Sequence, residues 1–182
     1  MEKQKYTAIV LAAGSGKRMN SKVHKQYLII QDRPVLYYSL KAFEDSAVDE
    51  IVLVVGKGEE KFCRKEIVDK YGISKVKAIV EGGKERYHSV FEGLKQTSDA
   101  DYVLIHDGAR PYVSKQSIND LVECLKTYDA GLLMVPCKDT IKEVKEGIVV
   151  KTLKRETLMQ AQTPQVFKSE DIKVAYQKAK DE

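Results

Sequence analysis

The 182-residue sequence predicts an α/β fold: a doubly wound, mostly parallel sheet from which a β-hairpin arm protrudes. Three observations predict it. Short runs of β-branched and apolar residues alternate with stretches in which apolar residues recur at helical spacing. The runs are almost continuously apolar, which is typical of strands covered on both faces. The length suits one domain with a substantial core, so we expect residues 1–182 to form a single domain.

The elements can be placed in chain order from this pattern. The predicted strands are Tyr6–Ala12, Glu50–Val55, Val76–Val80, Tyr102–His106 and Gly131–Pro136. A helix is expected behind Pro34, a residue suited to a first turn, with apolar positions Leu36, Leu40 and Phe43. Ser114 is a good N-cap for the next helix, whose apolar positions are Ile118, Leu121, Val122 and Leu125. A last helix is predicted over Ser169–Lys180.

Two short alternating runs interrupt this order after Pro136. They cover Ile141–Val144 and Ile148–Leu153, and the dipeptide Glu146-Gly147 between them suits a tight turn. We therefore expect a hairpin arm at about residues 138–155. Because a two-stranded hairpin is only marginally stable by itself, the arm should pack on the domain or on a partner chain.

Composition and charge exclude several classes of protein. The net charge is +4, from 31 basic and 27 acidic residues, which is too mild a bias for a general nucleic-acid binder. The apolar runs are too short to cross a bilayer, and no secretory leader precedes Tyr6. Cys63, Cys124 and Cys137 are widely spaced and indicate packed thiols in a reducing compartment. We expect a cytoplasmic protein with neither a nucleic-acid nor a membrane partner.

The loops after Ala12, Val80 and His106 should converge, because ligands bind outside the carboxyl ends of the strands in such sheets. The first loop reads Ala-Ala-Gly-Ser-Gly and is followed by Arg18 and Lys25. It fits neither GxxxxGK[ST] nor GxGxxG, whose third glycine position is occupied by Met19. It is small enough to lie against a base or a phosphate, although an ordinary turn with solvated lysines has the same composition.

Three further stretches carry candidate chemistry. Gly82-Gly83 would let a ligand approach the backbone closely, and Ser89 could donate a hydrogen bond to that ligand. Arg86 is expected to form a local ion pair with Glu81 or Glu85. Asp107 follows an apolar strand, where it could hold Mg²⁺ or a sugar hydroxyl, or cap the next turn with Arg110 as its partner. The arm is expected to carry Thr140, Arg155 and Thr163, of which Arg155 suits bidentate phosphate recognition or simple solvation.

Together these stretches resemble the 2-C-methyl-D-erythritol 4-phosphate cytidylyltransferases of the non-mevalonate isoprenoid pathway. The matching motifs are "LAAGSGKRM", "KQYL", "GGKERYHSV", "HDGARP", "DT" at Asp139-Thr140 and "TLKRETLMQAQTPQVF". The glycine motif alone is common to many nucleotidyltransferases, whereas the ordered set is specific and covers nearly all of the chain. The resemblance implies a Rossmann-like nucleotidyltransferase domain and a transfer of CMP from CTP to a sugar-alcohol phosphate, with release of pyrophosphate.

The resemblance also implies roles for individual residues. The CTP site would be lined by Ala12, Ala13, Gly14, Gly83, Lys84, Ser89 and Gly108. The transition state would be stabilised by Arg18 and Lys25, and the catalytic set would also include Arg155. The acceptor would be bound by Asp107, Arg110, Thr140, Arg155 and Thr163, with Thr140 and Arg155 offered by the arm of a second subunit in a homodimer. Mg²⁺ would assist, with Asp107 as its candidate ligand.

The sequence departs from the family pattern in places. His24 stands where a proline is usual, Met159 replaces a commoner aromatic residue, and the sequence stops at Glu182, short of the family's closing Thr-Asp-Asp stretch and late lysine. The sequence is either a truncation or a naturally short relative, and the absence of that lysine would weaken acceptor positioning. Two alternatives stay open at this point: a ribitol 5-phosphate cytidylyltransferase, which shares most of these motifs, and a non-catalytic nucleotide-binding module.

Overall fold

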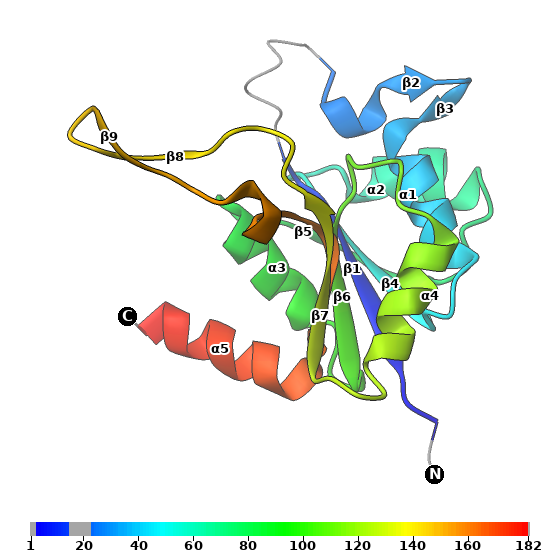
Figure 1. Ribbon diagram of the computed structural model, residues 1–182. Helices are drawn as coiled ribbons and strands as arrows, with labels where there is room; N and C mark the ends of the chain where they lie inside the picture. The colour runs from blue at the N-terminus through cyan, green and yellow to red at the C-terminus, as the bar shows by residue number, and fades with distance from the viewer. Residues whose placement is uncertain (1–2, 15–22, 182) are drawn as a thin grey trace.

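A computed structural model describes residues 3–14 and 23–181 of the chain, and a six-stranded sheet forms its centre (Figure 1). The strand order is β5 (Val76–Glu81), β4 (Glu50–Val55), β1 (Tyr6–Ala12), β6 (Tyr102–Asp107), β10 (Met159–Lys168) and β7 (Ala130–Pro136). Strands β5, β4, β1 and β6 run parallel, and β10 runs antiparallel to both of its neighbours. The prediction of a mostly parallel sheet is confirmed, and each strand that the sequence predicts ends within one residue of its expected bounds.

Helices cover both faces of this sheet, as a doubly wound fold requires. Helices α1 (Val35–Glu44) and α4 (Lys115–Cys124) pack on one face, together with α2 (Glu60–Cys63) and the π-helical turn η3 (Arg64–Asp69). Helices α3 (Arg86–Leu94) and α5 (Ser169–Asp181) pack on the other, and Figure 1 shows the two groups on opposite sides. The apolar stripes that the sequence predicts for α1 and α4 are buried: Leu36, Leu40, Phe43, Ile118 and Leu121.

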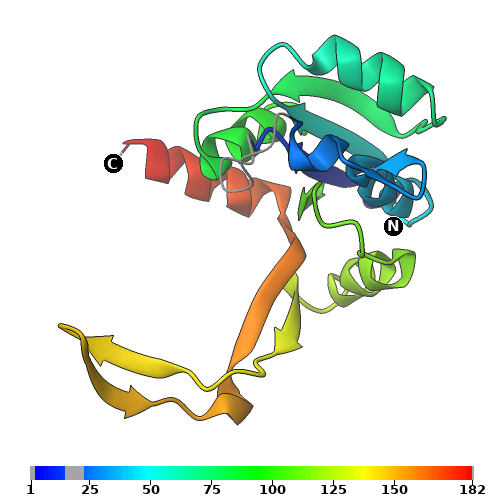
Figure 2. The same ribbon diagram turned by 90° about the horizontal axis from the view of Figure 1, so that it is seen from above.

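The predicted hairpin is present and extends away from the body of the molecule (Figures 1 and 2). Strands β8 (Lys142–Lys145) and β9 (Ile148–Thr152) pair antiparallel as a separate sheet. Glu146 and Gly147 have φ angles of 50° and 82°, the positive values that a two-residue hairpin turn needs. Every residue of both strands is exposed.

The main difference from the sequence prediction is the presence of a sixth strand in the central sheet, β10. Its polar residues Gln160, Gln162 and Gln165 break the apolar alternation, and Pro164 lies where the pairing with β7 shifts register. Thr163 therefore lies in the central sheet, and its predicted place on the arm is wrong.

Shorter elements connect these layers. They are η2 (Lys25–Tyr27), β2 (Ile29–Ile30), β3 (Arg33–Pro34) and η4 (Arg155–Thr157). Cys63, Cys124 and Cys137 are free thiols. Within the described ranges, no helix combines the length and the apolar character needed to cross a membrane.

Candidate active site

The loops after β1, β5 and β6 meet at the carboxyl edge of the sheet, as the strand order predicts. A Cβ atom on Gly82 would lie 2.5 Å from the Cβ of Ala13, so the second loop packs directly on the first. Gly108 N–H donates to Leu11 O at 2.8 Å, and a Cβ atom on Gly108 would lie 2.8 Å from Leu36 Cδ1. A side chain at residue 82 would force the first two loops apart, and one at residue 108 would press on α1 and β1.

Ser89 shapes the second loop from the first turn of α3. Its buried Oγ accepts the Gly83 N–H at 3.1 Å, and Glu85 N–H donates to His88 Nδ1 at 3.3 Å. These bonds fold residues 83–88 into a tight entry to the helix, with Gly83 and Lys84 exposed. The Ser89 hydroxyl thus holds the proposed CTP loop in shape.

Asp107 lies between two guanidinium groups at the end of β6. Arg86 Nε is 3.1 Å from Oδ1, and Arg110 Nε is 3.0 Å from Oδ2. Arg110 also donates from Nη1 to Gln162 Oε1 at 2.6 Å. Burial by itself raises the pKa of the Asp107 carboxyl, but the two arginines outweigh burial and hold the pKa below its ordinary value. The expected pairing of Arg86 with Glu81 or Glu85 is wrong, because Arg86 reaches across to the third loop.

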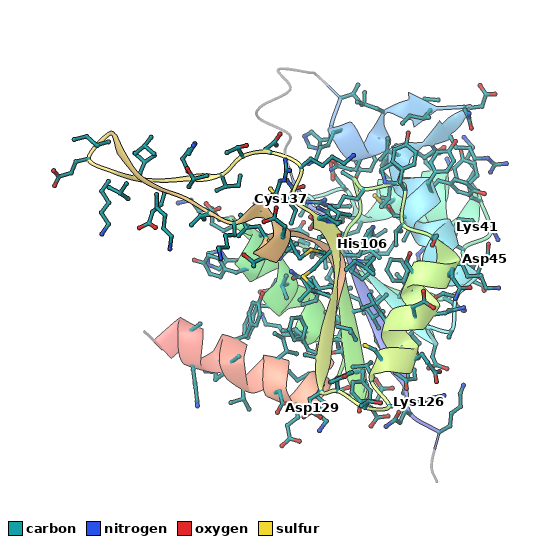
Figure 3. The ribbon with its side chains drawn as sticks, in the orientation of Figure 1. Lys41, Asp45, His106, Lys126, Asp129 and Cys137 are labelled. Atoms are coloured by element: carbon teal, nitrogen blue, oxygen red, sulfur yellow. The ribbon has the colours of Figure 1, made fainter. Side chains whose placement is uncertain are left out.

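A buried hydrogen-bond chain supports this loop from below. Thr163 Oγ1 accepts the Asp107 N–H at 3.2 Å and lies 3.0 Å from His106 Nδ1, while His106 Nε2 lies 3.3 Å from Arg110 O. A carbonyl oxygen only accepts, so the network assigns the proton to Nε2, and Nδ1 accepts from the Thr163 hydroxyl. His106 is fully buried within the body of the molecule (Figure 3), and burial lowers its pKa to about 4.

Ser39 of α1 completes the support of the same loop. Its buried hydroxyl lies 3.1 Å from Gly108 O and from Arg110 O. The sequence did not single out His106 or Ser39 as site residues. The only sequence feature that pointed to His106 was the presence of a histidine within an otherwise apolar predicted strand. No sequence feature pointed to Ser39.

Lys25 begins the short turn η2, next to the end of β1. The buried Gln26 side chain donates from Nε2 to Ala12 O at 2.6 Å, which joins this turn to the first loop. Lys25 itself is exposed. Arg18, the other candidate for stabilising the transition state, lies outside the described residues.

Thr140 and Arg155 lie at the arm and are exposed. Arg155 donates from Nη1 to Lys138 O at 3.2 Å, a contact within the arm segment itself. The described contacts do not bring either residue to Asp107 of the same chain.

The residues at this edge can be tested for their fit to Mg²⁺. Among residues 3–14 and 23–181, no three His, Cys, Asp or Glu side chains are grouped so that they could hold a metal ion. Mg²⁺ in phosphoryl-transfer sites is commonly held by one or two carboxylates together with substrate phosphates and water. Both oxygens of Asp107, the candidate carboxylate, lie against arginine side chains, so an ion at this edge would be held mainly by the polyphosphate and by water.

Comparison with known proteins identifies the family. A family model described as 2-C-methyl-D-erythritol 4-phosphate cytidylyltransferase matches residues 6–182. Proteins of that name from Lachnoclostridium phytofermentans and Alkaliphilus metalliredigens are 48% and 47% identical to the chain. The alignments cover 95% and 97% of this chain and 75% of each relative, so the chain spans about three quarters of their length.

Solved structures agree with this assignment. The crystal structure of 4-diphosphocytidyl-2C-methyl-D-erythritol synthase from Anaerococcus prevotii superposes with a TM-score of 0.86 at 32% identity. The match covers 98% of this chain and 76% of that one. A Francisella tularensis 2-C-methyl-D-erythritol 4-phosphate cytidylyltransferase matches with a TM-score of 0.77 at 31% identity, over 98% and 79% of the two chains. The motifs, the fold and these likenesses together show that the chain belongs to the 2-C-methyl-D-erythritol 4-phosphate cytidylyltransferase family.

Proposed function

We propose that this enzyme transfers CMP from CTP to 2-C-methyl-D-erythritol 4-phosphate. The products are 4-diphosphocytidyl-2-C-methyl-D-erythritol and pyrophosphate. One observation carries the proposal: two small-residue loops meet beside a carboxylate held between two arginines, all at the carboxyl edge of one sheet. This arrangement places the exposed Gly14 and Gly83 at the same edge as groups that can bind a hydroxylated anion.

The chemistry needs charge stabilisation more than a base. An oxygen of the acceptor phosphate attacks the α-phosphorus of CTP, and the bond from that phosphorus to the bridging oxygen of the β-phosphate breaks. Pyrophosphate leaves with the electron pair. The acceptor phosphate is ionised at neutral pH, so the barrier lies in bringing two anions together and in the charge that develops at the α-phosphate. Lys25, together with Arg18, would supply positive charge there.

The nucleotide side would be formed by backbone and small side chains. Ala12, Ala13 and Gly14 would lie along the base and the phosphates, with the second and third loops closing around them through Gly83, Lys84, Ser89 and Gly108. Ser89 contributes by holding Gly83 in place. A pocket lined in this way leaves backbone groups to read a pyrimidine, which favours CTP over purine nucleotides.

The acceptor side would be formed around Asp107. Its carboxylate can accept from a hydroxyl of the acceptor, and Arg110 can pair with the acceptor phosphate. Thr163 holds the backbone of Asp107 in place from β10. Mg²⁺ bound with the triphosphate would neutralise part of the charge that develops during transfer.

A second copy of the chain would complete the site. The exposed arm carries apolar residues with nothing described in its own chain to cover them, including Val144, Ile148, Val149 and Val150, which are at least half exposed. Burial of this surface in a homodimer would bring Thr140 and Arg155 of each arm to the acceptor bound by the other subunit. Free thiols at Cys63, Cys124 and Cys137 fit action in the reducing cytoplasm.

Steady-state pyrophosphate release tests the proposal. Release should require CTP and 2-C-methyl-D-erythritol 4-phosphate, and kcat/KM should exceed that with ribitol 5-phosphate. A preference for ribitol 5-phosphate would reassign the acceptor. Binding of CTP without release in the presence of either acceptor would favour a non-catalytic nucleotide-binding module.

A further inference from the structure

Glu59 lies in the loop after β4, and its carboxylate is fixed by that loop. Glu59 N–H donates to Gly56 O at 3.0 Å, and Oε2 of Glu59 accepts the Gly56 N–H at 3.0 Å. A Cβ atom on residue 56 would lie 2.7 Å from Oε2, so a side chain there would displace the Glu59 carboxylate. Cys63 N–H donates to Glu59 O at 2.9 Å, which ties the same residue to α2.

Two residues from a distant segment meet this carboxylate. Tyr27 Oη donates to Oε2 at 2.7 Å, and His24 Nδ1 lies 2.9 Å from Oε1. The carboxylate takes the single Tyr27 proton, so Cys63 Sγ, 3.1 Å away, donates to the Tyr27 oxygen. Burial raises the pKa of Tyr27 and raises the pKa of Cys63 to about 11, so both groups keep their protons at neutral pH.

These contacts flank Lys25 on both sides. His24 precedes Lys25, Tyr27 follows two residues later, and between them Gln26 is bound to Ala12 O. A 3₁₀ turn of three residues has little stability of its own, so the contacts of its neighbours set the position of Lys25. The Lys25 ammonium forms no ion pair with any residue in the described part of the chain.

We propose that Glu59 is a positioning residue for CMP transfer. Its carboxylate bridges His24 and Tyr27, and in this way holds the Lys25 ammonium where negative charge develops around the α-phosphate. The inference rests on the proposed function, which gives Lys25 its role. Glu59 acts through Lys25 and does not touch either substrate.

Steady-state kinetics of a variant that lacks the Glu59 carboxylate test this proposal. Glu59→Ala should lower kcat about 10- to 100-fold, because a displacement of about 1 Å in a catalytic group costs on the order of 10² in rate. KM for CTP should change little, since Lys25 acts mainly as charge develops. The double variant Glu59→Ala/Lys25→Ala should be no slower than Lys25→Ala alone, because Glu59 then has nothing to position.

A matched control separates positioning from general destabilisation. Glu44 also accepts from a side-chain hydroxyl, that of Ser74, and from a backbone N–H, that of Lys75 at 2.9 Å. Glu44→Ala therefore removes comparable hydrogen bonds without touching residues 24–27. It should lose stability as Glu59→Ala does, while kcat stays at the parental value.

Amide hydrogen exchange gives a readout that does not need turnover. Tyr27, Leu28 and Val35 N–H groups bond to His24 O, Lys25 O and Leu28 O at 2.9, 3.3 and 2.9 Å. Glu59→Ala should speed their exchange, and Glu44→Ala should not. If the parent transfers no CMP, the proposed function fails, and exchange still decides the role of Glu59. Unchanged exchange in Glu59→Ala, or losses of kcat that multiply in the double variant, would overturn the inference.

Discussion

The Thr163 hydroxyl connects β10 to the loop that carries the proposed acceptor residues. It accepts the Asp107 N–H and donates to His106 Nδ1, and the other nitrogen of His106 donates to Arg110 O. Both ends of the 107–110 turn are therefore fixed by one buried chain of hydrogen bonds. The direction of each bond follows from the groups involved, because an amide N–H only donates and a carbonyl oxygen only accepts.

Replacing Thr163 by valine keeps the shape of the side chain and removes the hydroxyl. The variant would leave the Asp107 N–H and His106 Nδ1 without partners in a buried place, at a cost of about 1–3 kcal/mol in the free energy of unfolding. KM for the acceptor should rise more than KM for CTP, because the turn that loosens carries Asp107 and Arg110. Urea denaturation and steady-state kinetics measure the two effects.

Thr97→Val provides the comparison, because the Thr97 hydroxyl is also buried and donates to Leu94 O at 2.9 Å, away from this turn. It should reduce stability without a selective effect on the acceptor. If Thr163→Val altered both KM values equally, the hydroxyl would serve stability alone.

The sequence predicted at which edge of the sheet several site residues lie, but it did not predict which side chains they contact. Asp107 and the glycines could be placed because they follow apolar strands, and parallel strands share one carboxyl edge. The partner of Arg86 could not be predicted, because its contact with Asp107 spans 21 residues and depends on how two loops approach. The bond between Tyr27 and Glu59 spans 32 residues and has no local pattern at all.

At the scale of elements, the strands with continuous apolar runs were predicted to within a residue. Those runs are buried on both faces, as Ile51–Val55 in β4 shows, and burial of this kind leaves a clear signal in the sequence. Strand β10 left none, because most of its residues before Thr163 are exposed and several are glutamine. Strand β10 forms because it pairs with β6 and β7, and the residue pattern within one strand does not indicate which strands it will pair with.

The exposed apolar residues of the arm lead us to predict that the chain forms a dimer. Ile148 and Val149 are 70% and 56% exposed, and successive strand residues point to opposite faces of the hairpin. If the arm packs on a second copy, the parent should sediment as a dimer, and Ile148→Asp or Val149→Asp should shift it toward monomer, because a carboxylate is costly to bury. Sedimentation equilibrium measures the shift.

Lys151→Gln, on the same strand, should leave the mass unchanged. A parental monomer at assay concentration, or a dimer that neither aspartate variant weakens, would count against the arm as the interface.

For the whole molecule, we propose that the site is shared between two subunits, and subunit mixing tests this. Arg18→Ala and Arg155→Ala should each be nearly inactive. If Arg155 serves the neighbouring site, a heterodimer of the two variants has one site with both changes and one with neither. Random exchange makes about half of the dimers heterodimers, so roughly a quarter of the parental activity should return.

No recovery after verified subunit exchange would place Arg155 in the site of its own chain. Recovery would also tie the arm to function and not only to assembly, since the exposed Arg155 has a described contact only within the arm segment.

The most direct test of CMP transfer follows the phosphate oxygens of the acceptor into the products. The enzyme is incubated with CTP and with 2-C-methyl-D-erythritol 4-phosphate whose phosphate oxygens carry ¹⁸O, and the products are analysed by ³¹P NMR and mass spectrometry. Attack by the acceptor phosphate on the α-phosphorus predicts that every labelled oxygen appears in the diphosphate product and none in pyrophosphate. Absence of the cytidylylated product, or label in the released pyrophosphate, would contradict CMP transfer by this site.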